Sequence, residues 1–294
     1  MVLTRRALNR ALLARQHLLA RVDLAGYAAV EHLFGLQAQA PSPPYFALWT
    51  RLRAFEPAEV SRLLVDRQVV RATVMRGTIH MLTAADFALI RPRVQPILDR
   101  LPTVNRPAVA DLDLAAVAAA GADLLAARPM TAKDLDAALA ERWPGYPTGT
   151  LAMTVSCTEP LVQVPPRGLW RRSGPPAFTT ARAWLGEHVP TESKPAELVL
   201  RYLAAYGPAS VRDMQSWAGV TRLGATFAEL RPRLVAFRDE AGVELFDLPD
   251  APRPAEDVPA PPRLLADFDA ILLGHADRTR IILDEHRRRV FTVN

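Results

Sequence analysis

Apolar residues recur at helical spacing along most of the chain. Over residues 5–22 the apolar positions include Ala7, Leu8, Ala11, Leu12, Leu18 and Leu19. This period predicts an amphipathic helix, and similar patterns predict helices over about 27–36 and 57–65. Pro44 suits the first turn of another helix that would include Leu48 and Leu52. The chain is therefore predicted to be rich in helix.

A different pattern follows these helical segments. The stretch VVRATVM at 69–75 is rich in β-branched residues and predicts a strand, and TIHML at 78–82 predicts its partner. Arg76 and Gly77 stand between the two stretches and suit a tight turn. Helices followed by a short hairpin are the composition of a winged helix.

Two later segments resemble each other. PMTAKDL at 129–135 matches PASVRDM at 208–214, and each follows an apolar stretch that predicts a helix, at 114–127 and 198–206. Thr131 and Ser210 suit helix N-caps, because Asp134 and Asp213 follow three residues later. The alternative is that two helix starts merely obey the same capping rule.

Each of these segments also precedes a candidate hairpin. The paired stretches are 161–164 with 168–171, and 234–237 with 243–246. We therefore predict a mainly α chain with short β-hairpins, an α+β fold. Its three helical units, each ending in a hairpin, are placed at 1–108, 109–191 and 192–294.

Composition limits the class of protein. The chain has 294 residues, of which 50% are hydrophobic, so it is long enough to bury more than one core. No apolar run approaches the ~20 residues of a membrane span, and the N-terminus lacks a signal-peptide pattern. The single cysteine, Cys157, excludes an internal disulfide framework. We expect a cytoplasmic protein with no membrane partner.

The charge balance is basic, at +5 with a sequence pI near 9.8. Lys133 and Lys194 are the only lysines, so arginine carries almost all of the positive charge. Arginine suits bidentate contacts to phosphate, and the excess is compatible with a polyanionic partner. GC-rich coding also favours arginine, alanine and proline, and explains most of this bias.

Several kinds of chemistry lack their motifs. The six histidines form no HExxH, and no Cys/His cluster has zinc spacing, so we predict no metal site. GxSxG, the P-loop and GxGxxG are absent, so we predict no nucleotide or other cofactor. Cys157 lies in an apolar stretch that predicts a helix, and is expected to be a core residue rather than a nucleophile.

Gln37 and Gln39 stand where a predicted helix meets a proline cluster. In an intact helix, residues two apart point about 200° apart, so their side chains would not converge. Pro41, Pro43 and Pro44 are expected to stop the helix near Gln37 and leave Gln39 in extended or turn backbone. Two neutral amides would then face one point. The alternative is a polar helix end with solvated amides.

Three groups of residues are candidates for nucleic-acid contact. A tryptophan among arginines suits stacking on a base, and clustered arginines suit phosphate. The alternative for each group is an ordinary solvated surface. The candidates are Arg71, Arg76, Thr78 and His80 on the first hairpin, Arg167, Trp170 and Arg171 on the second, and His275, Arg278 and Arg280 ahead of Arg287–Arg289.

Four segments together resemble the AlkZ-like DNA glycosylases of the azinomycin-resistance type. They are GLQAQAP at 35–41, MRGTIHM at 75–81, GLW at 168–170 and HADRTR at 275–280, and the likeness covers essentially the whole chain. The resemblance implies three tandem winged helices that form a concave surface for double-stranded DNA. It also implies removal of N7-alkylated purines, including bulky adducts and interstrand crosslinks. The family's paired catalytic glutamines map to Gln37 and Gln39.

Neutral amides suit this chemistry. Alkylation at N7 makes guanine a cation and a good leaving group, so no acid has to protonate it. The remaining task is to place a water at the anomeric carbon and to tolerate oxocarbenium character. An amide oxygen can accept a hydrogen bond from that water, and the amide nitrogen can fix its orientation. Neutral damaged bases are expected to resist such an enzyme.

Other readings stay open at this stage. Relatives continue with further strands beyond the segment matching 290–294, so we expect either lost strands or a fragment. A monomer is expected, because three tandem units supply an extended surface. The rival functions are a non-catalytic winged-helix DNA binder, such as a regulator or a drug-sequestering protein, and a protein-interaction module.

Overall fold

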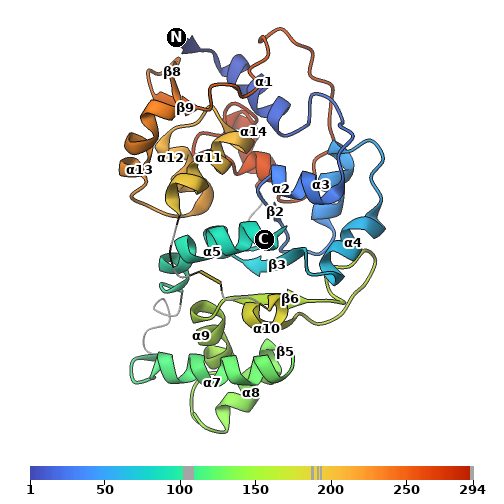
Figure 1. Ribbon diagram of the computed structural model, residues 1–294, viewed down its shortest axis with the longest axis vertical. Coiled ribbons are helices and arrows are strands. Elements are labelled where there is room, and N and C mark those ends of the chain that lie inside the picture. Colours follow the sequence, from blue (N-terminus) through green and yellow to red (C-terminus); the bar gives the residue numbers. More distant parts are fainter. Residues whose placement is uncertain (102–108, 187–188, 191, 193, 292–294) are drawn as a thin grey trace. The chain divides into compact units, whose positions relative to one another are not determined.

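The computed structural model describes residues 1–101, 109–186, 189–190, 192 and 194–291 (Figure 1). Two compact units make up the chain. Unit 1 contains Met1–Gln37, Pro43–Glu56 and the chain from Lys194, and unit 2 contains Ala38–Ser42 and Pro57–Ser193. The predicted domain ends at 108 and 191 lie outside the described residues, and the division into three domains stays a prediction.

Unit 1 combines the N-terminal and C-terminal elements. They are β1 (Val2–Leu3), α1 (Arg5–Arg15), α2 (Gly26–His32), β2 (Leu36–Gln37), α3 (Pro43–Arg51), α11 (Pro195–Tyr206), α12 (Val211–Ala218), α13 (Gly224–Leu230), η3 (Arg231–Arg233), β8 (Val235–Asp239), β9 (Glu244–Asp247), η4 (Ala270–Leu272) and α14 (Asp284–Val290).

Unit 2 holds the middle of the chain. Its elements are α4 (Pro57–Val65), β3 (Val69–Thr73), η1 (Met75–Gly77), β4 (Ile79–Thr83), α5 (Ala84–Leu98), α7 (Leu114–Ala127), β5 (Met130–Thr131), α8 (Ala132–Ala140), α9 (Thr150–Thr158), β6 (Leu161–Val164), β7 (Ala177–Thr180) and α10 (Ala181–Leu185).

Unit 1 contains helices α11 to α13 and a sheet with the strand order β1-β8-β9. Helix α11 contacts both α13 and strand β9. Strands β8 and β9 form the predicted third hairpin, and β1 pairs parallel to β8. Trp217 of α12 packs with Tyr202 and Tyr206 of α11, with ring centroids 5.1 and 5.5 Å apart. Aromatic burial of this kind supplies much of the area that stabilises a small helical core.

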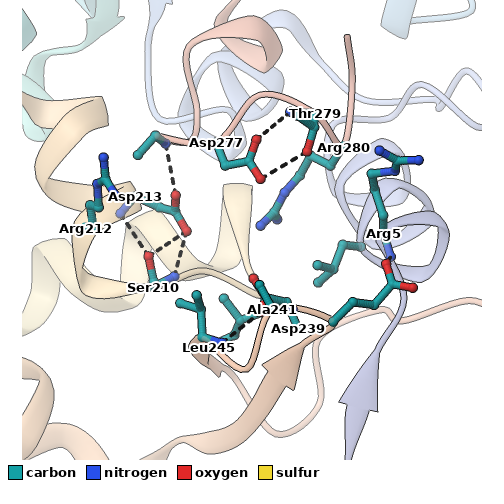
Figure 2. Close-up of a pocket in the computed structure, with 14 residues that line it drawn as sticks. Arg5, Ser210, Arg212, Asp213, Asp239, Ala241, Leu245, Asp277, Thr279 and Arg280 are labelled. Carbon is teal, nitrogen blue, oxygen red and sulfur yellow. Dashed lines mark hydrogen bonds between the residues drawn. The ribbon is translucent and has the colours of Figure 1, made fainter. Parts of the chain in front are cut away.

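Helix α12 begins at a complete capping box. The Ser210 hydroxyl accepts a hydrogen bond from the Asp213 amide, and the Asp213 carboxylate accepts from the Ser210 amide and hydroxyl (Figure 2). At the matching segment Thr131 caps α8, accepting from the Asp134 amide. Both predicted N-caps are thus confirmed, and each satisfies backbone donors that the helix leaves unpaired.

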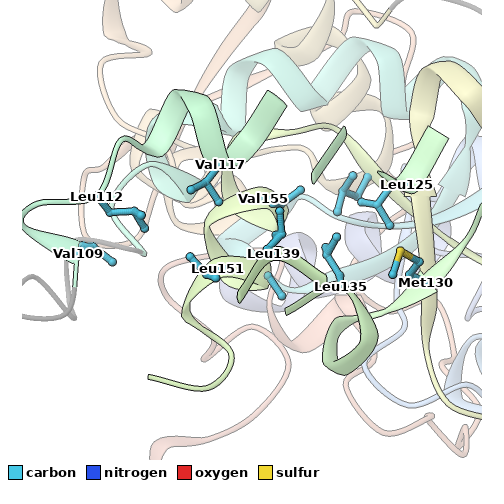
Figure 3. Close-up of a cluster of buried hydrophobic side chains, with 11 residues drawn as sticks. Val109, Leu112, Val117, Leu125, Met130, Leu135, Leu139, Leu151 and Val155 are labelled. Atoms are coloured by element: carbon cyan, nitrogen blue, oxygen red, sulfur yellow. The ribbon is translucent and has the colours of Figure 1, made fainter. Parts of the chain in front are cut away.

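In unit 2 the strands run in the order β4-β3-β6-β7-β5. The first predicted hairpin is confirmed, with Val69 opposite Thr83 and Thr73 opposite Ile79. Arg76 and Gly77 both have positive φ, at 56° and 68°, which closes the tight connection. Beneath the strands, α7, α8 and α9 pack around Val117, Leu125, Leu135, Leu139 and Val155 (Figure 3).

One element order occurs three times along the chain: helix, short extended segment, helix, helix, strand, strand. The series are α2-β2-α3-α4-β3-β4, then α7-β5-α8-α9-β6-β7, then α11, Ala209, α12-α13-β8-β9. The short segment bonds to the last strand in each described case: Ala38 to Ile79 of β4, β5 to β7, and Ala209 to Phe246 of β9. The repeat is therefore structural as well as sequential.

Two predicted helices are shorter than the apolar pattern indicated. Helix α1 ends at Arg15 rather than near 22, because His17 takes a positive φ of 53°. Helix α2 ends at His32 rather than near Leu36, because Phe34 and Gly35 have φ of 53° and 96°. Left-handed residues cannot continue an α-helix, and the apolar side chains beyond them are buried without helical backbone.

The second predicted hairpin is partly wrong. Strand β6 is Leu161–Val164 as expected, but its partner is β7 at Ala177–Thr180 rather than 168–171. Gly168 and Arg171 have φ of 102° and 54°, so residues 168–171 form turns. A longer connection therefore separates the two strands than the sequence indicated.

A buried ion pair joins the two ends of unit 1. Arg15 of α1 donates to both carboxylate oxygens of Asp247 at 2.7 Å, and neither side chain is exposed. Arg15 also donates to the Leu203 carbonyl, and Arg253 donates to Asp247. These bonds from both terminal nitrogens of Arg15 connect α1 to α11 and to the end of β9.

We expect Asp247→Asn to lower the free energy of unfolding by about 3–5 kcal/mol, because it leaves the Arg15 charge buried without its partner. The matched control is Asp23→Asn, which breaks the Arg53–Asp23 pair whose side chains are 63% and 67% exposed. That change should cost no more than about 1 kcal/mol. Chemical denaturation of both variants measures the difference, and equal losses would contradict the role assigned to the buried pair.

Candidate active site and DNA-facing residues

The two candidate catalytic glutamines lie outside helical backbone. Gln37 is the last residue of strand β2, and Gln39 lies in a bend over residues 39–42 that leads into α3 at Pro43. Pro43 and Pro44 thus begin the next helix and Pro41 lies in the bend, whereas positive φ at Phe34 and Gly35 ends the helix before it. Gln37 is the last residue of unit 1 and is 9% exposed, and Gln39 lies in unit 2 and is exposed.

Backbone and side-chain bonds hold the Ala38–Gln39 segment in unit 2. The Ala38 amide donates to the Ile79 carbonyl at 2.7 Å. The Ile79 amide in turn donates to Oε1 of Gln39 at 3.2 Å. This second bond identifies the oxygen of the Gln39 amide and leaves it one lone pair for another donor. Strand β4 therefore orients one of the two candidate side chains.

Arg71 also holds the Ala38 backbone in place. The prediction that Arg71 contacts DNA is wrong. Its side chain is fully buried in β3, with Nη2 donating to the Ala38 carbonyl at 2.9 Å and Nε donating to Oε1 of Gln163 at 2.8 Å. Burying a guanidinium is costly unless its donors are satisfied. Arg71 therefore acts on the glutamine segment from inside the protein.

Gly168 packs directly over the Arg71 side chain. A Cβ at Gly168 would lie 2.5 Å from Cδ of Arg71, and its φ of 102° is a conformation that L side chains rarely adopt. A glycine is required here for both reasons. The GLW segment at 168–170 thus closes over the arginine that positions Ala38, and the backbone amide of Trp170 is held by Ser61 Oγ at 3.0 Å.

Besides Arg71, the first hairpin carries three residues predicted to contact DNA, of which two are part-exposed and one is buried. Arg76 and Thr78 are part-exposed, whereas His80 is 2% exposed and cannot contact DNA from its position. His80 Nδ1 lies 3.0 Å from the Thr78 carbonyl, and Arg76 Nη2 lies 3.4 Å from its Nε2. Burial and the neighbouring Arg76 charge lower the pKa of His80 to about 3, although the bond to the Thr78 carbonyl acts in the opposite direction. A neutral His80 therefore steadies Arg76.

The second group keeps its predicted exposure. Arg167 and Trp170 are part-exposed and Arg171 is exposed, with the Arg171 guanidinium 5.8 Å from the Trp170 ring centroid. Arg167 donates to the Gly174 carbonyl at 3.0 Å, which shapes the connection between β6 and β7. The Arg171 charge thus lies beside the Trp170 ring at this connection.

In the third group, only Arg278 is accessible. It is part-exposed and lies 4.4 Å from the Phe291 ring centroid. His275 and Arg280 are 2% and 9% exposed, so the prediction that they contact DNA is wrong. Arg280 donates to the Pro208 carbonyl, and His275 Nε2 lies 2.9 Å from the Tyr206 carbonyl.

Asp213 lies at the centre of this third group and was not among the predicted site residues. Burial acts to raise its pKa, but His275, Arg280 and the bonds to Ser210 outweigh it, so the pKa of Asp213 is lowered. Its Oδ1 also accepts from the Ala276 amide (Figure 2). The HADRTR segment is thus anchored to the start of α12, and its charges serve the fold of unit 1.

Three further predictions concern Cys157, metal sites and membrane spans. Cys157 is buried, and burial raises the pKa of its thiol to about 11, which suits a core residue. Within the described ranges, no three His, Cys, Asp or Glu side chains are grouped as a metal site would need. In the same part of the chain, no helix has the length and apolar character to cross a bilayer.

Sequence reasoning missed Gln163 and Ile79 as parts of the site. Gln163 lies opposite Arg71 in the register of β3 and β6, 92 residues away in the chain. Ile79 acts through backbone groups, which its side-chain type does not reveal. Only strand pairing brings these residues to the glutamine segment.

We expect Gly168→Ala to destabilise the protein by about 1–3 kcal/mol, because the added methyl group must displace Arg71 and adopts a strained φ. Gly149→Ala is the matched control, since Gly149 also has a positive φ of 86° but no atom within 4 Å of the added carbon. Denaturant unfolding compares the two. A loss no larger in Gly168→Ala than in Gly149→Ala would contradict the packing argument.

The buried His80 predicts a pH dependence of stability. Its pKa is about 3 in the folded protein against 6.5 for an ordinary histidine, so the unfolded state binds more protons between these values. Stability from this residue is complete above pH 6.5 and falls by about 1.4 kcal/mol per pH unit below it. Unfolding measured at pH 7 and 5 should show a smaller loss in His80→Gln. His286→Gln, at an exposed histidine, should keep the wild-type loss, and an unchanged loss in His80→Gln would refute the assignment.

Comparison with known proteins matches this geometry to one family. The model of the AlkZ-like DNA glycosylases matches residues 30–294. The curated interstrand DNA cross-link repair glycosylase of Streptomyces sahachiroi is 25% identical over 94% of this chain and 79% of its own length. The structure of the Streptomyces sahachiroi DNA glycosylase AlkZ superposes with a TM-score of 0.80 at 23% identity, covering 98% of this chain and 82% of that one. The chain belongs to the AlkZ-like family of DNA glycosylases, hydrolases that act on N-glycosyl bonds.

Proposed function

We propose that the protein is a monofunctional glycosylase that hydrolyses the N-glycosidic bond of cationic N7-alkylpurines in double-stranded DNA, using a water positioned by Gln37 and Gln39. The substrates include bulky adducts and interstrand crosslinks. The Streptomyces relative is named for interstrand cross-link repair, which supports the last of these. The proposed reaction needs no cofactor, because the alkylated base is itself a good leaving group.

The observation that carries the proposal is the set of hydrogen bonds that fixes the backbone at Ala38, between the two glutamines. The Ala38 amide and carbonyl are bonded to Ile79 and Arg71, and the Gln39 oxygen is bonded to the Ile79 amide. Gln37 ends strand β2 and Gln39 lies in the bend that follows, so only Ala38 separates the two glutamines along the chain. A segment held at its centre keeps two flexible amides within a narrow range of positions.

The oriented amides suit a water at the anomeric carbon. Gln39 Oε1 uses one lone pair on Ile79 and has a second for a water hydrogen. The negative end of the amide dipole also favours the positive charge that develops on the sugar. The C1′–N9 bond breaks with its electron pair going to the base, and the water oxygen bonds to C1′ and releases its proton to bulk solvent. A neutral amide is a poor base, so only labile lesions should react.

We further propose that the repeated element order marks three tandem winged helices, with a concave DNA-binding surface formed by one copy of the chain. The matching position of the short segment in each series supports this arrangement. The contacts proposed for DNA are the accessible candidates alone, because buried guanidinium groups cannot reach phosphate. They are Arg76, Thr78, Arg167, Trp170, Arg171 and Arg278.

The test is release of 7-methylguanine from duplex DNA. We expect Gln37→Ala and Gln39→Ala each to lower the single-turnover rate by at least about tenfold, and the double variant by more, because the water loses its orientation. Gln68→Ala is the matched control, since Gln68 is an exposed glutamine whose backbone alone makes hydrogen bonds. It should release base at the wild-type rate.

The outcomes separate the rival functions. Tight DNA binding with no base release in the wild-type protein would favour the non-catalytic DNA binder. Failure to bind DNA at any salt concentration would favour a protein-interaction module. Fast excision of uracil or hypoxanthine would contradict the restriction to cationic bases, since those bases need a stronger acid than an amide.

A further inference from the structure

A pocket of about 210 Å³ lies in unit 2. One side is the face of the sheet that carries the Arg71, Gln163 and Phe178 side chains, which are adjacent in the strand register. The other side is formed by Arg91 of α5, Ser156 of α9, and Glu159. Ser156, Glu159 and Phe178 are part-exposed, so the pocket is open to solvent.

The pocket adjoins the segment that contains the proposed catalytic residue Gln39. Ile79 lines the pocket and is bonded through its backbone to both Ala38 and Gln39. Arg71 also lines it and donates to the Ala38 carbonyl. A base that leaves the sugar beside Gln39 therefore has this pocket as an immediate neighbour.

Two polar groups of the pocket, the Gln163 amide and the Glu159 carboxyl, can make further hydrogen bonds. Gln163 is 4% exposed, and its Oε1 accepts from Arg71, so its Nε2 is a defined donor. Among the residues that the structure describes, no group accepts from that Nε2 and none donates to the Glu159 carboxyl. Burial raises the pKa of Glu159, with Arg91 acting in the opposite direction. Both groups stay accessible to water, so a ligand with matching donors and acceptors can take the place of that water.

The ligand that matches these groups is a guanine-type base. Guanine carries adjacent N1–H and N2–H donors, which a carboxylate accepts together, and an O6 acceptor, which an amide or guanidinium serves. The volume is below the ~300–1,000 Å³ of pockets for drug-sized ligands, so it suits a base alone rather than a nucleotide. Phe178 and Leu161 supply the apolar walls that a planar ring needs.

We propose that this pocket binds the base released from lesions with a small alkyl group, such as 7-methylguanine, with the Glu159 carboxylate accepting from its N1–H and N2–H; bulky adducts and crosslinked bases exceed its volume. The inference rests on the proposed function for the identity of the base. Cleavage of C1′–N9 sends the bonding pair to N9, so a cationic lesion becomes a neutral base. Arg71 and Arg91 beside the pocket disfavour the cation and favour the neutral product, which helps the base to depart.

The experiment is binding of free 7-methylguanine and of adenine to the full chain, followed by ligand-observed NMR. We expect wild-type protein to bind 7-methylguanine, and Glu159→Gln to weaken binding by at least about tenfold, because the amide presents a donor to N1–H or N2–H. Asp123→Asn is the matched control, since Asp123 is an exposed carboxylate of the same unit that does not line this pocket. Its affinity should stay within about twofold of wild type.

Binding of adenine distinguishes specific recognition of guanine from non-specific binding of any purine. It lacks the N1–H donor, so it should bind more weakly than 7-methylguanine and respond little to Glu159→Gln. Thermal unfolding of each variant confirms that the fold is kept. No binding of 7-methylguanine at about 5 mM, equal binding of adenine, or an unchanged affinity in Glu159→Gln would each overturn the proposal.

Base release from DNA distinguishes this failure from failure of the proposed function. Release of 7-methylguanine from duplex DNA without binding of the free base would overturn the pocket alone. Binding of the free base that needs Glu159, without release from DNA, would support the pocket and contradict the glycosylase mechanism.

Discussion

The buried guanidinium of Arg71 is the constraint on which the proposed active site depends. A full charge with no solvent exposure persists only where its donors meet acceptors, and here the acceptors are the Ala38 carbonyl and the Gln163 side chain. The same side chain leaves no room for a Cβ at Gly168. One arginine therefore links strand β3, strand β6, the GLW turn and the backbone between the two glutamines.

In the proposed mechanism, this arrangement is what allows neutral amides to serve as catalytic groups. Gln39 is exposed, but its oxygen is bonded to the Ile79 amide, so the side chain has a defined orientation before substrate arrives. Orientation has to carry most of the catalysis, because an amide supplies almost no acid or base strength. In the proposed mechanism, the buried polar contacts therefore fix the backbone at the glutamines, and no carboxyl with a shifted pKa is needed.

The charged motifs are of two kinds, those whose charges are buried in the protein and those whose charges are exposed. HADRTR supplies His275 and Arg280 to the interior of unit 1, where the Arg280 charge favours the Asp213 carboxylate at the start of α12 and burial lowers the pKa of His275 to about 3. Arg167 and Arg171 lie on the turns that connect β6 to β7 and keep their exposure. Both kinds look like phosphate-binding arginines in the sequence, since residue type alone does not reveal which charges have internal partners.

The sequence by itself determined the helix-rich composition, the first and third hairpins, the N-caps at Thr131 and Ser210, and the likeness that singled out Gln37 and Gln39. These depend on local periodicity, on capping chemistry within one turn, and on short motifs. The tertiary structure decided where helices α1 and α2 stop, which strand pairs with β6, and which arginines are buried. The reason is physical: positive φ values and buried ion pairs are stabilised by contacts with segments far away in the chain, and no local pattern records those contacts.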